Sequence, residues 1–362
     1  CRGQRPLVDA LVALGSHPSP LWILIANGWG QDPVGAEFNP MTMRMELTDV
    51  AAVIFNPVAQ VKFVHTVAAG YVAASLFVMG VSSWYLLRRM EVRFALRSFA
   101  IASGFGLAAI LSVIVLGDES GYRSGEVQKV KLAAIEAEWH TEPAPASFTL
   151  FGLPDQGDET THGAIKIPYL MGIIATRSLD EQVTGLKDLK AQHEVRIRSG
   201  MLAYDALEAL RSDGSNAEAR ATFERHRADL GYGLLLTPHA KEIGKADESA
   251  IAKAVDDSIP QVAPLFLSFR LMVGIGVVLL GLFAAAFLQL CRGKLVQSPR
   301  LLKALFWSIP LPWIAIEAGW FVAEFGRQPW TISDVLPVSA SVSLLQPGQL
   351  WFSLIAIFLI YS

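Results

Sequence analysis

Five apolar segments, each close to the length that crosses a lipid bilayer, constrain the fold of this chain more than any other feature. A membrane-spanning helix needs about 20 predominantly apolar residues. The first segment contains His17, Pro18 and Pro20, so we expect it to be kinked. The pattern predicts an all-α protein, built as a polytopic bundle of transmembrane helices with a large polar loop. The segments are residues 7–26, 64–87, 98–116, 265–290 and 304–323.

The composition agrees with a membrane protein and argues against other classes. Hydrophobic residues make up 52% of the chain and charged residues only 17%, and the nine tryptophans suit membrane interfaces. The net charge of -3 comes without a basic patch of the kind that binds nucleic acid. The two cysteines, Cys1 and Cys291, provide neither a disulfide framework nor a metal-ligand spacing.

Both ends of the sequence lead us to expect an interior fragment of a longer protein. The chain begins at Cys1 without an initiator methionine or a signal peptide. It ends at Ser362, inside a sixth apolar run that begins near Gly348.

Basic residues occupy every second connection between the apolar segments. By the positive-inside rule these connections are cytoplasmic. Residues 29–61, 117–264 and 324–349 are then outside, which is the periplasm if the chain lies in a bacterial inner membrane. The predicted domains are transmembrane helices over 1–116, a periplasmic loop over 117–264 and transmembrane helices over 265–362. The basic residues are Arg2 and Arg5, then Arg88, Arg89, Arg93 and Arg97, then Arg292, Lys294, Arg300 and Lys303.

The long loop is predicted to contain helices and to divide into two parts. Helical stretches are expected over residues 180–211, with a charged, solvated face, and over the charged residues 216–230, and a stretch rich in lysine, aspartate and alanine follows over 241–257. We interpret residues 190–255 as a spacer. The first third of the loop differs, because acids, glycines, glutamines and lysines crowd directly after a membrane helix.

The run from Pro310 to Trp330 carries two carboxylates, Glu317 and Glu324, followed by Arg327. Seven residues make about two helical turns, so both carboxylates are expected to point roughly the same way. Intramembrane carboxylates are costly and usually serve a function in a polar interior. Neutralisation by a neighbouring helix is the structural alternative.

Three further groups lie in the apolar segments. His65 is either a hydrogen-bonded packing residue, a proton relay, or a ligand of a metal or haem. Arg270 costs about 2.5–3.5 kcal/mol to insert, so it should have an anionic partner, such as a glutamate or a haem propionate. Met272 is either core filler or, with a histidine from another helix, half of an axial haem pair.

Four charged residues, Asp118, Glu119, Lys131 and Glu136, are expected at the outer membrane surface. Such groups can bind a quinol headgroup and accept its protons, although an interfacial charge cluster would look the same. The sequence contains no P-loop, dinucleotide fingerprint, CxxC or HExxH motif. Any chemistry therefore belongs to a membrane cofactor.

Several of these stretches together resemble subunit I of the cytochrome bd-type quinol oxidases, in the version with a long quinol loop. The resemblance runs through nearly the whole chain and is loose only around residues 190–255. It rests on GWGQDPVGAEFNPMTMRME (28–46), NPVAQVKFVHTVAAGY (56–71), LGDESGY (116–122), VQKVKLAAIEAEW (127–139), GIIATRS (172–178) and EAGWFVAEFGRQPW (317–330).

The resemblance implies roles for individual residues. His65 and Met272 match the axial ligands of the low-spin haem b558, and Arg270 matches the arginine close to that haem. Lys131 and Glu136 match the loop residues assigned to quinol binding and oxidation.

At the other haems, Glu324 matches the ligand of the high-spin haem b595, and Trp320 matches an aromatic residue placed among the haems. Arg327 would then pair with a propionate. The family's ligand for haem d is an early histidine that we expect outside this chain, and His17 is not assigned that role.

The implied function is that of a bd-type terminal oxidase subunit, which oxidises ubiquinol or menaquinol at the periplasmic face and reduces oxygen to water. Charge separation then generates a proton gradient without pumping. The implied partners are subunit II, small single-span subunits and the lipid bilayer, with no nucleic acid. The alternatives are a haem-free proton-coupled transporter, with Glu317, Glu324, Arg270 and His65 as its relay, and a scaffold subunit without cofactors.

Overall fold

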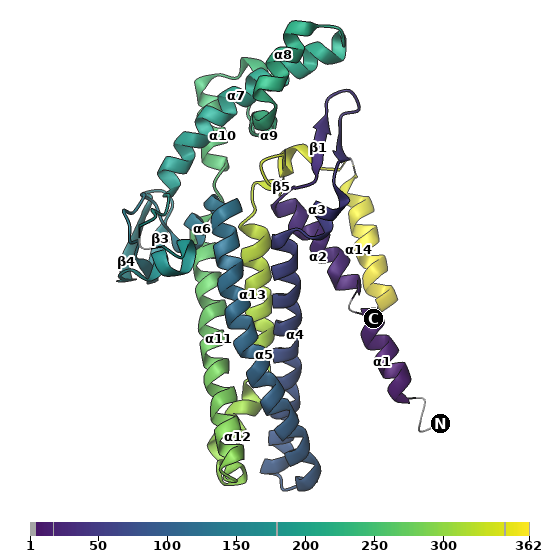
Figure 1. The fold of residues 1–362 in the computed structure, drawn as a ribbon, viewed down its shortest axis with the longest axis vertical. Coiled ribbons are helices and arrows are strands. Elements are labelled where there is room, and N and C mark those ends of the chain that lie inside the picture. Colours follow the sequence, from purple (N-terminus) through teal and green to yellow (C-terminus); the bar gives the residue numbers. More distant parts are fainter. Residues whose placement is uncertain (1–4, 17, 179, 344, 362) are drawn as a thin grey trace.

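The computed structural model describes residues 5–16, 18–178, 180–343 and 345–361 as a tall helical bundle with a polar headpiece at one end (Figure 1). Among these residues, four helical stretches are long and apolar enough to cross a membrane, which confirms the predicted all-α polytopic class. They are Val50–Leu87, Val92–Val127, Glu248–Cys291 and Pro299–Phe325. The helices concerned are α3 (Val50–Ile54), α4 (Pro57–Leu87), α5 (Val92–Val127), α10 (Glu248–Asp257), α11 (Val262–Cys291), α12 (Pro299–Trp307) and α13 (Leu311–Phe325).

Four of these helices, α4, α5, α11 and α13, pack in a cyclic order, each against the next. The core between them is apolar and closed, since Leu76, Phe99 and Phe283 are all fully buried. Two glycines let the helices approach closely. A β-carbon at Gly106 would lie 2.2 Å from the Phe283 ring, and one at Gly80 would lie 2.5 Å from Ile309.

Local sequence signals account for several element boundaries. The side chain of Asn56 accepts hydrogen bonds from the backbone N–H groups of Val58 and Ala59 and so caps α4, which begins at Pro57. Helix α5 does not stop where its apolar run ends, and continues beyond residue 116 through the polar stretch to Val127. The polar residues after 116 therefore extend a membrane helix rather than begin a loop.

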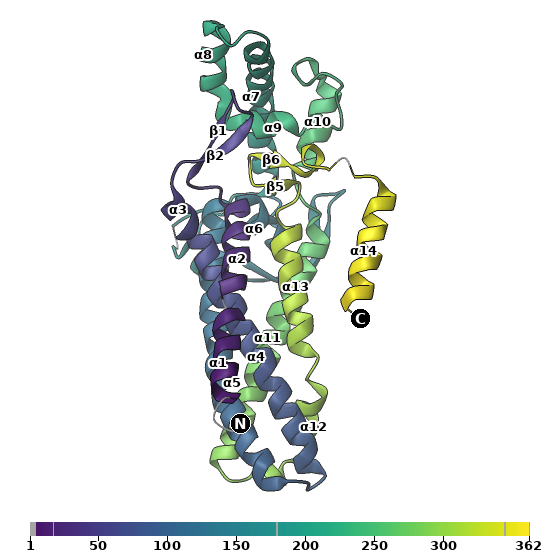
Figure 2. The same ribbon diagram turned by 90° about the vertical axis from the view of Figure 1, so that its right-hand side faces the viewer.

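The first predicted span takes a different form. The structure places α1 (Arg5–Ser16) and α2 (Pro18–Gln31) on either side of position 17, and neither alone is long enough to cross a bilayer. His17, like Cys1 and Arg2, lies outside the described residues. At the other end of the chain the sixth apolar run forms α14 (Pro347–Tyr361), which stands apart from the bundle (Figure 2).

The headpiece contains the predicted loop helices and also short hairpins, which the sequence analysis missed. The hairpins are β1 (Ala36–Asn39) with β2 (Arg44–Leu47), β3 (Phe148–Asp155) with β4 (Thr160–Ile167), and β5 (Trp330–Ile332) with β6 (Leu336–Pro337), all antiparallel. The helices are α6 (Lys129–Glu136), α7 (Leu186–Ser212), α8 (Ala217–His226) and α9 (Leu230–Leu234), with short turns η1 (Gly172–Thr176), η2 (Arg227–Asp229) and η3 (Ile243–Lys245). Two more short turns complete the chain: η4 (Leu295–Gln297) precedes α12, and η5 (Val338–Ala340) follows β6.

The region interpreted as a spacer, residues 190–255, is fastened to the rest of the chain. Arg196 of α7 donates to Asp334, which follows α13, at 2.9 Å, and Tyr232 donates to the same carboxylate at 2.9 Å. On the other side Phe38 of β1 packs against Phe223 of α8. The spacer therefore rests on two connections from the membrane bundle.

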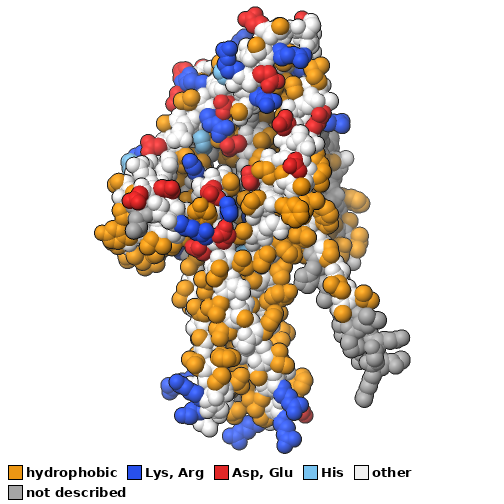
Figure 3. All heavy atoms as spheres, in the orientation of Figure 1, with side chains coloured by type: hydrophobic (Ala, Val, Ile, Leu, Met, Phe, Trp, Pro, Cys, Tyr) orange, Lys and Arg blue, Asp and Glu red, His pale blue; other side chains and the backbone are white. Residues whose placement is uncertain are grey.

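Two of the three basic groups predicted on one side, residues 88–97 and 292–303, lie at the end of the bundle opposite the headpiece (Figure 3), and Arg2 of the third lies outside the described residues. We call this end of the bundle the basic end, and the other the loop end. Gly117 lies 20 residues along α5 from Arg97, and Met272 lies 20 residues along α11 from Arg292. At 1.5 Å per residue they lie about 30 Å from the basic end, which is the thickness of a bilayer's hydrocarbon core.

Gly106→Ala should destabilise the bundle, because its new methyl group has no room beside Phe283. We expect a loss of about 1–3 kcal/mol, the usual cost of overpacking a core, seen as a lower melting temperature of the purified protein. Gly104→Ala is the matched control, since its β-carbon would meet Phe287 at an ordinary 4.0 Å. Equal melting temperatures for the two variants would contradict the packing described here.

Candidate functional site

Four groups of residues lie near the loop end of the bundle, and they include nine of the ten residues assigned roles from the sequence, all but Trp320. The first surrounds Glu324, close to the end of α13. The Glu324 carboxylate accepts hydrogen bonds from Asn27 at 2.7 Å and from Arg327 at 2.7 Å. Arg327 thus pairs with Glu324 itself in this structure.

Two lysines join this group through amide side chains. Lys62 of α4 donates to the Asn27 carbonyl oxygen at 3.0 Å. Lys131 of α6 donates to Gln31 at 3.0 Å and to Gln128 at 2.7 Å, and Gln31 in turn donates to Asn27 at 3.1 Å. We call these seven residues, Asn27, Gln31, Lys62, Gln128, Lys131, Glu324 and Arg327, the Glu324 cluster.

The Glu324 cluster has three cationic side chains and one carboxylate. Lys131 is only 4% exposed, and burial, together with the nearby Lys62, lowers its pKa well below the ordinary value. The Nε atom of Arg327 is buried without a hydrogen-bond partner among the described residues. An anionic group here would favour the charged form of Lys131 and accept a hydrogen bond from the spare Arg327 donor, so the cluster is suited to such a group.

A cavity of about 180 Å³ lies beside the Glu324 cluster. Its walls include Lys131 and Arg327 on the cluster side and His193, Arg196 and Asp334 on the headpiece side. Burial lowers the pKa of His193 to about 4, so this imidazole is neutral at physiological pH. The cavity is thus a polar space between the membrane bundle and the headpiece.

The second group is His65 with Met272, on helices α4 and α11, which lie across the cyclic bundle from each other. The His65 ring lies against Gly117 of α5, where a β-carbon would be 3.4 Å from its Cε1 atom. The sulfur of Met272 lies against Gly319 of α13, where a β-carbon would be 2.9 Å away. Counted from the loop-end starts of α4 and α11, the two residues are about 12 Å and about 15 Å deep.

The Nδ1 atom of His65 is buried and makes no hydrogen bond of ordinary geometry within the described residues. The backbone carbonyl of Val113 is close to the ring without completing such a bond. A buried imidazole nitrogen without a partner is rare, because each unmade hydrogen bond costs free energy. The Nδ1 atom is therefore available to a further partner, and the packing, proton-relay and ligand alternatives for His65 all stay open.

The third group, at the loop end of the α5 membrane run, is the acidic pair with Arg177. Arg177, just after η1, donates to Asp118 at 3.2 Å and to Glu119 at 2.6 Å, and its guanidinium lies 4.3 Å from the Tyr122 ring centroid. Asp118 is the residue directly after Gly117, so this group begins beside the His65 contact.

The fourth group is the buried pair of Glu136 and Arg270. Arg270 donates to the Glu136 carboxylate at 2.9 Å and to the backbone carbonyls of Ile135 and Thr149. The expectation that Arg270 has an anionic partner is met by Glu136. Burial raises the pKa of Glu136 to about 7 even though Arg270 favours its charged form.

The structure places Lys131 and Glu136, both expected at the outer membrane surface, in different groups. Five residues turn a helix by about 140° beyond one full turn, so the two side chains leave α6 on different sides. Lys131 joins the Glu324 cluster, whereas Glu136 faces α11. Glu317 is exposed and lies outside all four groups, and Trp320 is half-buried on α13.

Sequence reasoning missed Asn27, Gln31, Lys62, Gln128 and Arg177. Four of them lie inside the sequence stretches on which the resemblance was based, and Asn27 directly precedes one. Lys62 also carried a physical signal, because a lysine one turn before His65 on a membrane helix needs a polar partner.

Comparison with known proteins places these groups in a family. A sequence model described as "Cytochrome bd terminal oxidase subunit I" matches residues 2–362. The chain is 50% identical over 359 residues to cytochrome bd-II ubiquinol oxidase subunit 1 of Escherichia coli, covering 99% of this chain and 70% of that protein. The chain belongs to the cytochrome bd terminal oxidase subunit I family.

More distant relatives agree with this membership. Cytochrome bd ubiquinol oxidase subunit 1 of Bacillus subtilis is 32% identical over 353 residues, covering 97% of this chain and 63% of that protein. The bd oxidase of Geobacillus thermodenitrificans has the same fold, with a TM-score of 0.68 at 23% identity, over all of this chain and 68% of that one. The chain thus spans roughly two thirds of its relatives' length.

The family membership confirms the predicted resemblance and the predicted class of enzyme, a quinol oxidase that acts in electron transport. It implies haem cofactors in general and a subunit of a larger membrane complex. The competing interpretations, a haem-free transporter and a scaffold without cofactors, are disfavoured, because the relatives are oxidases.

The ion pair between Glu136 and Arg270 should show strong energetic coupling. Removing either partner leaves a buried charge unpaired, at a cost of about 3–5 kcal/mol. We expect Glu136→Gln and Arg270→Met each to lower the melting temperature of the purified protein. The double variant should be more stable than the sum of the two losses predicts. Strictly additive losses would show that the two side chains do not interact.

Proposed function

We propose that this chain forms the quinol-oxidising and haem-binding part of a bd-type terminal oxidase, with its loop end facing the periplasm. The observation that carries the proposal is the packing of His65 against Gly117, directly before the Asp118–Glu119 pair held by Arg177. A ligand position on α4 therefore lies beside the part of α5 that carries the acidic pair. This is the arrangement that a two-electron, two-proton donor requires.

His65 and Met272 would hold a low-spin haem b between α4 and α11. The His65 Nδ1 atom has no hydrogen-bond partner among the described residues, which supports a ligand role, and both residues lie at similar depth on opposite helices. A haem held in this way would supply one-electron transfer. Gly117 and Gly319 let the two side chains pack closely against α5 and α13, since a β-carbon would lie 3.4 Å from His65 and 2.9 Å from Met272.

Glu324 would hold the high-spin haem b. The excess positive charge of Lys62, Lys131 and Arg327 fits the carboxylates that such a group carries. Trp320 is one turn before Glu324 on α13, near enough in sequence to pack against the same group. The ligand of haem d is expected outside this chain.

At the loop end, carboxylates would take the protons that leave the quinol. Glu136 is suited to this role, because a base works best when its pKa is near the operating pH. Asp118 and Glu119 lie nearer to His65 in sequence and are held by Arg177, so they would orient the headgroup and receive a proton. Lys131 would instead contribute to the Glu324 cluster, which is proposed to hold the high-spin haem. Oxygen would be reduced with protons from the basic end, which separates charge across the membrane without a pump.

The names of the relatives include both ubiquinol and menaquinol oxidases, so the substrate class is a membrane quinol. As in those complexes, subunit II would be the main protein partner, and small single-span subunits are expected beside it.

His65→Ala should abolish the low-spin haem b bands, because no other described histidine lies in the membrane bundle. The measurement is a dithionite-reduced minus oxidised spectrum of membranes that contain the full-length subunit and its partner. His140→Ala, at an exposed headpiece position, is the control and should leave the spectrum unchanged. An intact low-spin spectrum in His65→Ala would refute the ligand assignment.

Glu136→Gln should slow quinol oxidation by about 10²-fold or more, the usual contribution of a general base. In the native protein the rate should fall as the pH drops through about 7, because a protonated Glu136 cannot accept a proton. The Glu136→Gln variant should lack this fall in rate, the acidic limb of the pH profile. Glu126→Gln, an exposed carboxylate paired with Arg123, should keep it. An unchanged limb in Glu136→Gln, with haem content also unchanged, would assign the proton to another group.

A further inference from the structure

The β3–β4 hairpin exposes an unusual concentration of large apolar side chains. Phe151 and Ile165 are paired across the two strands, and they are 53% and 57% exposed. Single exposed apolar residues need no explanation, but a contiguous group marks a surface that contacts something apolar. The exposed apolar residues of this hairpin are Leu150, Phe151, Leu153, Ile165 and Ile167.

The hairpin is fixed along the outer side of α11 rather than standing free. At its base, the guanidinium of Arg270 donates to the backbone carbonyl of Thr149. Near its turn, the backbone N–H of Val262 donates to the Gln156 side chain at 3.0 Å. Strand β3 therefore rises along α11 from the level of Arg270 to the first residue of the helix, which is about 12 Å.

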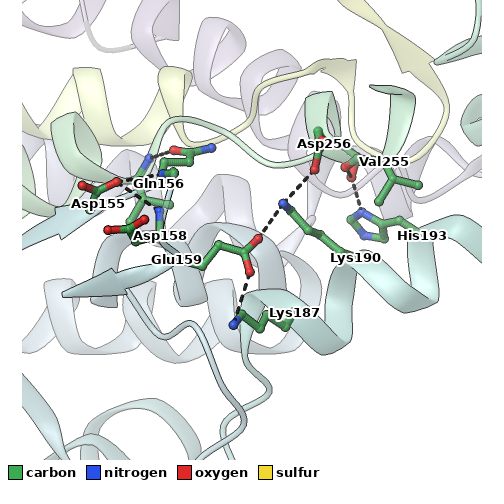
Figure 4. A network of polar contacts seen from close by, with 12 residues as sticks. Asp155, Gln156, Asp158, Glu159, Lys187, Lys190, His193, Val255 and Asp256 are labelled. Atoms are coloured by element: carbon green, nitrogen blue, oxygen red, sulfur yellow. Dashed lines mark hydrogen bonds and ion pairs between the residues drawn. The ribbon is translucent and has the colours of Figure 1, made fainter. Parts of the chain in front are cut away.

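The turn of the hairpin is tied to the headpiece by ion pairs (Figure 4). Glu159 contacts Lys187 at 3.4 Å and Lys190 at 2.9 Å, both on α7. Lys190 also contacts Asp256 of α10 at 2.9 Å. With its base and its turn both held, the hairpin keeps its apolar side chains at a fixed height.

That height coincides with the membrane boundary at the loop end. Met272 is about 30 Å from the basic end, so the hydrocarbon core ends close to it. Thr149 contacts Arg270, two residues beyond Met272, and this places the base of the hairpin at the boundary. In Figure 3 the apolar surface of the membrane helices continues directly onto the lower edge of the hairpin.

We propose that the apolar side chains of the β3–β4 hairpin insert into the interfacial layer of the lipid leaflet at the loop end. The continuity with the membrane-facing surface favours lipid as the partner. The backbone also favours the interfacial layer over the hydrocarbon core. The outer edges of a two-stranded hairpin have unpaired N–H and C=O groups, and hydrocarbon offers them no hydrogen-bond partner. In the interfacial layer, headgroups and water satisfy those groups while acyl chains cover Phe151 and Ile165.

A single-cysteine experiment on the intact oxidase tests this location. Phe151→Cys and Ile165→Cys are made in a background without native cysteines, labelled with an environment-sensitive fluorophore and reconstituted into phosphatidylcholine vesicles. Some of the lipid carries a nitroxide near the top of its acyl chain. Val195→Cys, 68% exposed on α7 in the headpiece, is the water-facing control, and Val277→Cys, 64% exposed on α11, is the lipid-facing control.

We expect the nitroxide lipid to quench most of the fluorescence of labels at 151 and 165 and little of that at 195. Aqueous iodide should quench the label at 195 strongly and the labels at 151 and 165 weakly. Strong quenching by iodide alone at 151 and 165 would overturn the proposal and leave the hairpin in water. Protection from both quenchers would also overturn it, and would assign the surface to a protein partner. Haem spectra of each labelled variant verify that the protein is folded.

Discussion

The guanidinium of Arg270 joins three parts of the chain that are far apart in sequence. It binds the end of α6 through Ile135 and Glu136, and the base of β3 through Thr149, from a position on α11 at the edge of the membrane. It also lies 3.4 Å from the ring centroid of Phe266, one turn earlier. An unpaired arginine at this depth would be costly, and these contacts offset that cost. The positions of Glu136 and of the hairpin depend on them.

The same principle explains how much of the structure could be predicted from the sequence. The apolar runs fix the membrane helices, because only helices satisfy their backbone groups internally in lipid. The cost of a buried charge likewise predicts that Arg270 has an anionic partner. It does not say which one, because Glu136 is 134 residues away in the sequence. Periodicity inside one helix gives only relative directions, so the different surroundings of Lys131 and Glu136 emerge from the packing of α2, α6 and α11.

Other features lacked a usable local signal. The β3–β4 hairpin has register irregularities around Phe151 that interrupt simple alternation, so its strands do not give the period-two pattern of a sheet. The Glu324 cluster depends on Asn27 and Gln31, neutral residues that carry no electrostatic signal of their own. Around position 17 a helix-like composition is interrupted by two prolines, and the structure describes helices only on either side of it.

The two ends of α6 contact different groups of polar residues. Lys131, near its start, lies with Glu324, whereas Glu136, at its end, lies with Arg270 on the side of β3 and the lipid. In the proposed function a quinol would reach its site through the bilayer and its protons would leave through water, so the site would lie where both phases meet. The α5 acids, Arg177 and Glu136 gather at that level, where the hydrocarbon ends about 30 Å from the basic end. Burial at this boundary raises the pKa of Glu136 to about 7, while apolar surface remains close by.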